Sequence, residues 1–249
     1  MKVFLKSQAN RIRSVGTFWI AKYTLEQVES IRAHEIDIVL NILPPKGKIL
    51  EIGAGTGWQA KILETHGYDV CAIDLPSSNY RDNRVWPVTE YNGKNIPYSN
   101  ETFDIVFSSN VLEHIPRLHE FQREILRVLK PDGCAIHVVP SGSWRFWTAI
   151  THVLKFWTFP IVHGEHAGNP LSEIYYFSRH RWVKLFRETG WNVVTQSSNR
   201  LFYTGDLIMG TRWSIATRSK LSNVFGSSCH IFVLKKGNSF LQQDMISSN

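Results

Sequence analysis

The chain has 249 residues, 43% of them hydrophobic and 20% charged, so it is long enough for one large domain and too apolar to be disordered. Its three cysteines are widely spaced, which argues against a disulfide framework or a structural zinc site and favours a reducing compartment. Residues 1–50 carry eight basic and four acidic side chains, residues 51–140 carry eight and twelve, and residues 141–249 carry twelve and five. The net charge of +7 therefore comes from two basic flanks, which suit either an anionic partner or a solvated surface.

The first predicted element is a helix from about Leu25 to Leu43. Thr24 and Gln27 have the spacing of a capping box at its start, and Pro44 follows its end. The N-terminal twenty residues have no continuous apolar core and no small-residue cleavage site, so they do not indicate a secretory signal.

The middle of the chain predicts strands that alternate with helices. The expected strands are 48–52, 68–75, 85–89, 103–108 and 134–139, and the expected helices are 58–66 and 117–130. Such alternation is typical of a mainly parallel sheet that is covered on both faces.

After Pro140 the pattern changes. An aromatic-rich stretch leads into a loop rich in His and Gly at 161–170, and Ser178 caps a helix that ends at Gly190. Two late strands, at 191–195 and 230–234, flank a polar stretch for which no element is predicted, and they suit an antiparallel pair at the sheet edge. The predicted fold is α/β, a three-layer sandwich with a mainly parallel seven-stranded sheet and one antiparallel strand near the edge.

A glycine turn joins the first strand to the next helix. Gly53, Gly55 and Gly57 form G-x-G-x-G, with Glu51 two residues before the first glycine. Exposed backbone N–H groups at a helix start suit an anionic ligand group. Trp58 occupies the position where the dinucleotide fingerprint needs a small residue, so the spacing disfavours a nicotinamide dinucleotide.

The run ILEIGAGTG at this turn, SSNVLEHI at 108–115 and ILRVLKPDG at 125–133 resemble motifs of the class I S-adenosylmethionine-dependent methyltransferases, over roughly residues 35–140. The resemblance implies that the glycine turn contacts the methionine part of the cofactor, that Glu51 holds its ammonium side, and that Asp74 accepts both ribose hydroxyls. Asn92 would lie beside adenine, where the family more often has an acid. The full set expected to bind S-adenosylmethionine is Glu51, Gly53, Ala54, Gly55, Asp74, Leu75, Asn92, Gly93 and Asn110.

No Pro/Gly/Ser-rich linker is long enough to separate domains, so one methyltransferase domain, 1–249, is predicted, with three parts. These are an N-terminal extension with the first helix (1–45), a cofactor-binding core (46–140) and an acceptor-side region (141–249).

His114 is the predicted catalytic residue. It follows the fourth strand, and ligands in open α/β sheets lie outside the carboxyl ends of the strands, so it should overlook the transferable methyl group. A neutral imidazole there could take a proton from a hydroxyl acceptor, although a His that merely packs against the cofactor is the alternative. Glu113 is expected to be a structural hydrogen-bond partner.

The loop His163-Gly164-Glu165-His166 offers imidazole and carboxylate groups. No second cluster accompanies it in the sequence, so no metal site is predicted. Because the loop follows the fifth strand, His163 and His166, together with Trp144, are expected to contact the acceptor.

The aromatic stretch 144–162 has two helical faces. One is apolar and the other carries cations; the apolar set is Trp144, Trp147, Ile150, Leu154 and Trp157, and the polar set is Arg145, Thr148, His152 and Lys155. The stretch is too interrupted by charge to span a bilayer, and it suits a membrane-surface helix, a lid or a core helix.

The predicted function is S-adenosylmethionine-dependent methyl transfer, most simply to oxygen of a small-molecule, glycan or lipid-linked acceptor. The alternatives are a quinone-type C-methyltransferase and a non-catalytic protein that binds S-adenosylmethionine. No RNA-binding module is recognisable, so no nucleic-acid partner is expected. The expected location is the cytoplasm, with peripheral contact to the inner face of the membrane.

Overall fold

The computed structural model describes residues 25–158, 160–205 and 212–237. Within these ranges one sheet has the strand order β3-β2-β1-β4-β5-β7-β6. Its strands are β1 (Lys48–Ile52), β2 (Asp69–Asp74), β3 (Thr89–Glu90), β4 (Phe103–Ser109), β5 (Leu129–Pro140), β6 (Trp191–Ser198) and β7 (Cys229–Lys236). All neighbours pair in parallel except β7, which is antiparallel to both β5 and β6. The predicted seven-stranded sheet with one antiparallel strand near the edge is confirmed.

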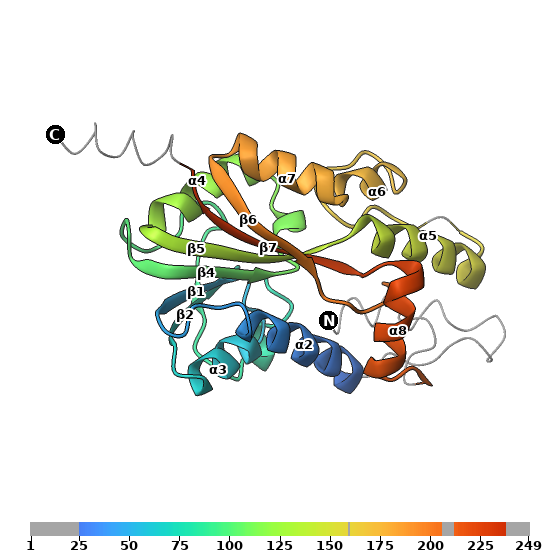
Figure 1. The fold of residues 1–249 in the computed structure, drawn as a ribbon, viewed down its shortest axis with the longest axis horizontal. Helices are drawn as coiled ribbons and strands as arrows, with labels where there is room; N and C mark the ends of the chain where they lie inside the picture. The colour runs from blue at the N-terminus through green and yellow to red at the C-terminus, as the bar shows by residue number, and fades with distance from the viewer. Residues whose placement is uncertain (1–24, 159, 206–211, 238–249) are drawn as a thin grey trace.

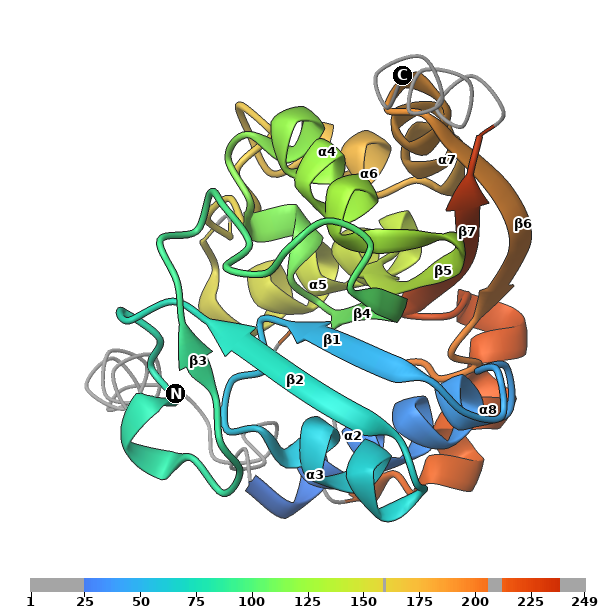
Figure 2. The same ribbon diagram turned by 90° about the vertical axis from the view of Figure 1, so that its left-hand side faces the viewer.

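Helices cover both faces of this sheet, as Figure 2 shows. One face carries α2 (Leu25–Leu40), α3 (Trp58–Thr65) and α8 (Ile215–Phe225), and the other carries α4 (Leu118–Val128), α6 (Ser172–Tyr176) and α7 (Arg179–Glu188). Helix α5 (Gly142–Phe156) extends beyond the sheet (Figure 1), and two short 3-10 turns, η1 (Arg81–Asn83) and η2 (Leu112–His114), lie in the loops. The three-layer prediction is therefore confirmed.

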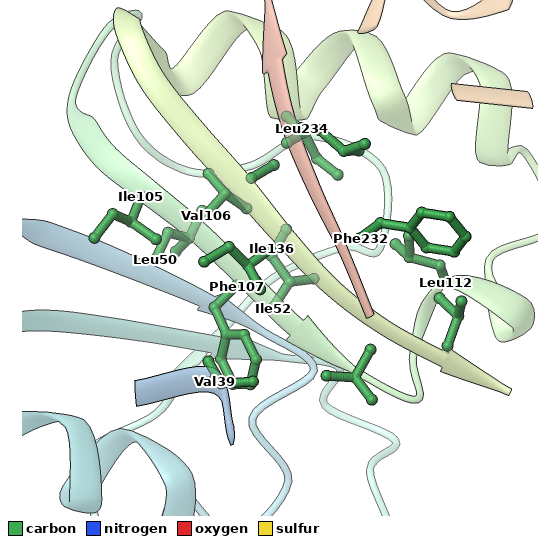
Figure 3. Packing of buried hydrophobic residues seen from close by; sticks show 14 of the residues in the cluster. Val39, Leu50, Ile52, Ile105, Val106, Phe107, Leu112, Ile136, Phe232 and Leu234 are labelled. Atoms are coloured by element: carbon green, nitrogen blue, oxygen red, sulfur yellow. The ribbon is translucent and has the colours of Figure 1, made fainter. Parts of the chain in front are cut away.

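The core lies between the central strands and these helices. Ile49, Leu50 and Ile52 on β1 are fully buried although they point to alternate faces, because helices cover both sides of a parallel sheet. Figure 3 shows Val39 of α2 and Phe107 of β4 among the buried side chains of this core. Each such aliphatic or aromatic side chain stabilises the fold by about 1.5–3 kcal/mol through burial.

Some predicted boundaries were wrong. Strand β5 begins at Leu129 and takes in Pro131-Asp132-Gly133, which were expected to end the preceding helix; the pairing register with β4 shifts there, so the turn residues form an irregularity within the strand. The third strand contains only two residues. Helix α8 was not predicted, because its sequence lacks an apolar stripe, and Ser214 caps it by accepting from the amide of Thr217. The Thr24 cap and the N-terminal segment lie outside the described residues.

The two faces proposed for the aromatic helix are also corrected. The buried side of α5 contains Trp144, Arg145 and Thr148, while Leu154 and Trp157 of the expected apolar face are exposed. Arg145 is buried because it pairs with Glu173 of α6, so polar residues can occupy the inner side. In residues 25–158, 160–205 and 212–237, no helix is long and apolar enough to cross a membrane.

Candidate functional site

The predicted cofactor residues gather where β1, β2, β3 and β4 end. Gly53 and Ala54 donate their amides to the carbonyl of Ile73, over 2.9 and 3.1 Å, and Gly55 donates its amide to Oδ2 of Asp74 over 2.9 Å. The turn after β1 is thus fixed against the end of β2. Parallel strands bring their carboxyl ends to one edge, which is why residues distant in sequence meet here.

The glycine turn has backbone angles and close neighbours that exclude a side chain. Gly53 and Gly55 have φ angles of 69° and 58°, in the left-handed region that favours glycine. A Cβ on Gly53 would collide with the side chain of Val111, and one on Gly55 would lie 3.3 Å from the ring of Tyr80. Glycine is therefore needed here for the backbone angles of the turn and for its close packing against Val111 and Tyr80.

Glu51 provides a buried, incompletely paired carboxylate beneath the turn. Its side chain is 2% exposed, and Oε2 has no hydrogen-bond partner among the residues that the structure describes. Burial raises the pKa of Glu51 to about 8, against the lowering effect of a hydrogen bond from the backbone of Ala60, and the nearby Asp74 adds to the rise. A cationic group would satisfy this acceptor, so the residue fits the ammonium of S-adenosylmethionine.

Asp74 ends β2 with its carboxylate already engaged. Oδ2 accepts from the amide of Gly55 and from the hydroxyl of Ser78, over 2.9 and 2.8 Å, and Oδ1 accepts from the amide of Leu75 over 2.7 Å. A carboxylate offers about four acceptor positions. A ribose diol would therefore share the carboxylate with these donors or replace one of them.

Asn92 and Gly93 lie just after β3. The side-chain oxygen of Asn92 accepts from the amides of Lys94 and Asn95, over 2.9 and 2.8 Å, so it shapes its own loop. Gly93 has a φ of 74°, and a Cβ there would lie 2.9 Å from the half-exposed side chain of Leu75. Contact between Leu75 and Gly93 gives the loop an apolar wall, and an adenine contact by Asn92 remains a prediction.

Asn110, directly after β4, is held by a buried network that the sequence analysis did not find. It adopts a φ of 55°, and its Oδ1 accepts from Sγ of Cys229 over 3.5 Å. The same sulfur lies 3.1 Å from the hydroxyl of Tyr203, which donates to Glu35 of α2 over 2.8 Å. Only the tertiary fold brings these segments together, so no local pattern could have predicted them.

His114 lies in η2, after the end of β4. Its side chain is 45% exposed, and burial of the imidazole by its neighbours lowers the pKa of His114 below its ordinary value. The adjoining Glu113 is only 1% exposed, and neither of its oxygens accepts a hydrogen bond from another described residue; the nearest charge partner is Nε2 of His114, at 3.8 Å. A structural hydrogen bond to the side chain of Glu113 therefore stays a prediction, and burial raises the pKa of Glu113 to about 8.

The structure brings His163 and Trp144 to His114. The ring of His163 lies 4.8 Å from that of His114 and 4.9 Å from that of Trp144, with Phe177 behind it at 6.4 Å. Desolvation by these neighbours, followed by the effects of His114 and Arg145, lowers the pKa of His163 to about 3. The surroundings of His114 are thus largely aromatic, with the charge of Glu165 near enough to oppose the lowering of its pKa.

His166 points elsewhere. It lines a pocket with Leu118, Tyr176 and Arg181, and of the site residues predicted from sequence only His166 lines that pocket. The structure thus separates the two loop histidines that the sequence analysis grouped.

Glu113, His114 and His163 offer ligand atoms within 4.8 Å of one another. Three ligands around one zinc ion would lie about 3.4 Å apart, and the guanidinium of Arg145 lies near enough to lower the pKa of His163. We assign no metal to this group.

Comparisons with known proteins identify the family of this chain. The family model described as "Methyltransferase domain" matches residues 25–196. Over 118 residues the chain is 31% identical to a ubiquinone biosynthesis O-methyltransferase of Rickettsia canadensis, covering 44% of this chain and 47% of that protein. Over 131 residues it is 28% identical to the 2-methyl-6-phytyl-1,4-hydroquinone methyltransferase of a Synechocystis species, covering 49% and 40%. The chain thus spans less than half the length of these two curated relatives.

The fold has solved counterparts as well. The crystal structure of an S-adenosylmethionine-dependent methyltransferase from Mesorhizobium loti has a TM-score of 0.57 and 14% identity, covering 82% of this chain and 98% of that one. At that identity the likeness shows the fold alone. The family match covers most of the chain and includes the glycine turn, Asp74 and His114. The chain therefore belongs to the class I S-adenosylmethionine-dependent methyltransferases, with S-adenosylmethionine as cofactor.

Proposed function

We propose that this enzyme transfers a methyl group to an oxygen of a small-molecule, glycan or lipid-linked acceptor, with His114 as the general base. The observation that carries the proposal is the position of His114. It is half-exposed after the carboxyl end of β4, and its ring lies against that of His163, which in turn packs on Trp144.

The mechanism assigns separate tasks to the two sides of the site. When bound, S-adenosylmethionine would supply a methyl group on a positively charged sulfur. The sulfur would leave as the acceptor oxygen binds the methyl carbon from the opposite side. Glu51 and the glycine turn hold the amino-acid part, and Asp74 orients the ribose. His114, neutral near pH 7 because burial lowers its pKa, accepts the proton that the acceptor hydroxyl loses.

The surroundings of His114 favour an acceptor with an apolar or aromatic part. Trp144 and Phe177 are buried beside His163, and Trp144 and His163 present ring faces and edges rather than charges. A pair of packed aromatic rings stabilises a complex by about 0.5–1.5 kcal/mol beyond the effect of burying their surface. The named activities of the two curated relatives also concern quinone-type rings, so methyl transfer to a ring carbon is the second candidate.

Lipid-linked acceptors receive support from the exposed surface near the end of α5. Leu154, Trp157 and Ile161 are 70%, 82% and 82% exposed, and the region 141–249 carries the larger basic surplus. We place the enzyme in the cytoplasm, in peripheral contact with an anionic membrane face.

The test uses S-adenosylmethionine with an isotopically labelled methyl group, incubated with the enzyme and a cell extract. Mass spectrometry should find label on an oxygen, and His114→Ala should remove that product. Label on a ring carbon would favour the second candidate. Absence of any labelled product in several extracts, despite cofactor binding, would contradict both.

A further inference from the structure

The loop that carries His163 is held by a buried ion pair with no assigned task. Nε of Arg145, on α5, lies 2.6 Å from Oε2 of Glu173, on α6, and the two side chains are 2% and 0% exposed. Replacing a buried pair with apolar groups is often neutral or stabilising, so such a pair is weak evidence of a purely stabilising role. Its contacts point to a different one.

Both members of the pair hold the backbone of the loop. Oε1 of Glu173 accepts from the amides of His163 and Gly164, each over 2.7 Å. Arg145 donates from NH2 to the carbonyl of Ile161 over 2.8 Å. Charge-assisted bonds of this kind are about twice as strong as neutral ones. Three backbone groups of the loop are therefore fixed from one side by the Arg145–Glu173 pair.

The other side of the loop rests on the turn that carries His114. The amide of Glu165 donates to the carbonyl of Glu113 over 3.0 Å. A Cβ on Gly164 would lie 2.8 Å from that carbonyl, so only glycine permits this approach. The loop is thus held between the ion pair and η2. In this position the ring of His163 packs against those of His114 and Trp144.

We propose that Arg145 and Glu173 are positioning residues that set the acceptor wall: they hold residues 161–165 over η2 so that His163 faces His114. This proposal rests on the proposed function of His114. The pair touches neither cofactor nor acceptor and acts only through the loop. Misplacing reactants by about 1 Å can reduce a rate about a hundredfold, which is why a rigid wall has value for the reaction.

The test compares Glu173→Gln with two other proteins. Glutamine keeps an oxygen for the two amides but removes the charge that pairs with Arg145. The double variant Arg145→Gln/Glu173→Gln restores neutrality in the pocket. Leu63→Ala, in the buried face of α3 away from the loop, serves as a control for lost stability alone, because it leaves a cavity in the core.

Three readouts separate positioning from stability. Hydrogen exchange of residues 161–165 should accelerate in Glu173→Gln, and the NMR titration midpoint of His114 should rise toward 6.5 as its neighbours loosen. Label transfer in cell extract should fall roughly tenfold to a hundredfold, while cofactor affinity stays within about twofold. The double variant should recover part of each change, and Leu63→Ala should show none of them.

The proposal is overturned if folded Glu173→Gln keeps the exchange rates and the His114 midpoint of the parent, or if Leu63→Ala reproduces the changes. If Glu173→Gln does not fold, the double variant replaces it in the same comparison with the parent. Exchange and titration need no acceptor. A parent that never transfers label therefore contradicts the proposed function, while these two readouts still decide the role of the pair.

Discussion

The backbone N–H of Gly55 donates to Oδ2 of Asp74 over 2.9 Å, and this bond joins the glycine turn after β1 to the end of β2. One carboxylate thus both shapes the turn and faces the expected ribose position. Changing either residue should disturb cofactor binding through both effects.

Asp74→Asn should weaken the binding of S-adenosylmethionine and of its demethylated product about tenfold to a hundredfold, because a charge-assisted hydrogen bond contributes about 1.5–3 kcal/mol. Gly55→Val should weaken binding as well, since its φ of 58° disfavours a branched side chain. Calorimetric titration measures the affinities. Asp69→Asn, at the exposed start of the same strand, is the matched control and should bind as the parent does. Parent-like binding by both site variants would refute the assignment.

A second prediction concerns Glu51. In the folded protein, burial raises the pKa of Glu51 from its ordinary 4.5 to about 8. The folded state therefore holds a proton that the unfolded state releases between these values. The stability that this proton contributes is complete below pH 4.5 and is lost as pH rises through 8, at roughly 1.4 kcal/mol per pH unit. Glu51→Gln cannot titrate.

Urea denaturation from pH 5 to 8 should show the parent losing stability relative to Glu51→Gln. Histidines with a lowered pKa, such as His137, also change the stability below pH 6.5. Their contribution is the same in the parent and in Glu51→Gln, so it cancels in the difference between the two. Glu120→Gln, an exposed surface change, is the control and should give a flat difference. A flat difference for Glu51→Gln would mean that the buried carboxylate stays ionised.

The sequence predicted the part of the fold that depends on local patterns. Apolar runs of five to seven residues predicted β1, β2 and β4, because such runs have few other structures available. The positions of Glu51, Asp74 and His114 at the carboxyl edge followed from the strand order typical of the family. Strand β3 is too short to show such a pattern, and α8 has no apolar stripe that would predict a helix.

The acceptor side could not be predicted in the same way. Arg145 has a charged side chain on an aromatic helix, and helical spacing assigned it to the solvent face. Only its contact with Glu173, on another helix, makes burial favourable. Similarly, His163 and His166 share a loop, yet the clamp on the backbone of His163 turns the two rings to different neighbours.

The third prediction concerns catalysis by His114. His114→Ala should lower label transfer about 10²–10⁴-fold with little change in cofactor affinity, because a general base acts on the acceptor rather than on the cofactor. In the parent, activity should fall on the acid side with a midpoint below 6.5, since burial lowers the pKa of His114. His66→Ala, an exposed histidine at the end of α3, is the control. Near-parent activity of His114→Ala would leave His114 only a packing role.

The last prediction concerns the membrane contact, and the structure sharpens the choice of variants. Trp147 packs against Phe225 and donates to its carbonyl over 2.9 Å, so replacing it would disturb α8. Arg145 is buried and cannot face lipid. Leu154 and Trp157 are 70% and 82% exposed, so their replacement should leave the fold intact.

The parent should sediment with vesicles that contain anionic lipid more than with neutral ones, and less as salt is added, because each basic residue near the surface contributes only about 1 kcal/mol and is screened. Leu154→Ala/Trp157→Ala should lose most of this association, since burial of one aliphatic side chain alone contributes about 1.5–3 kcal/mol. Val85→Ala, 54% exposed near η1, is the control for a lost surface hydrophobe and should bind as the parent does. If the double variant also binds like the parent, or if the parent never sediments with vesicles, the end of α5 contacts no lipid. That result would favour a freely diffusing acceptor over a lipid-linked one.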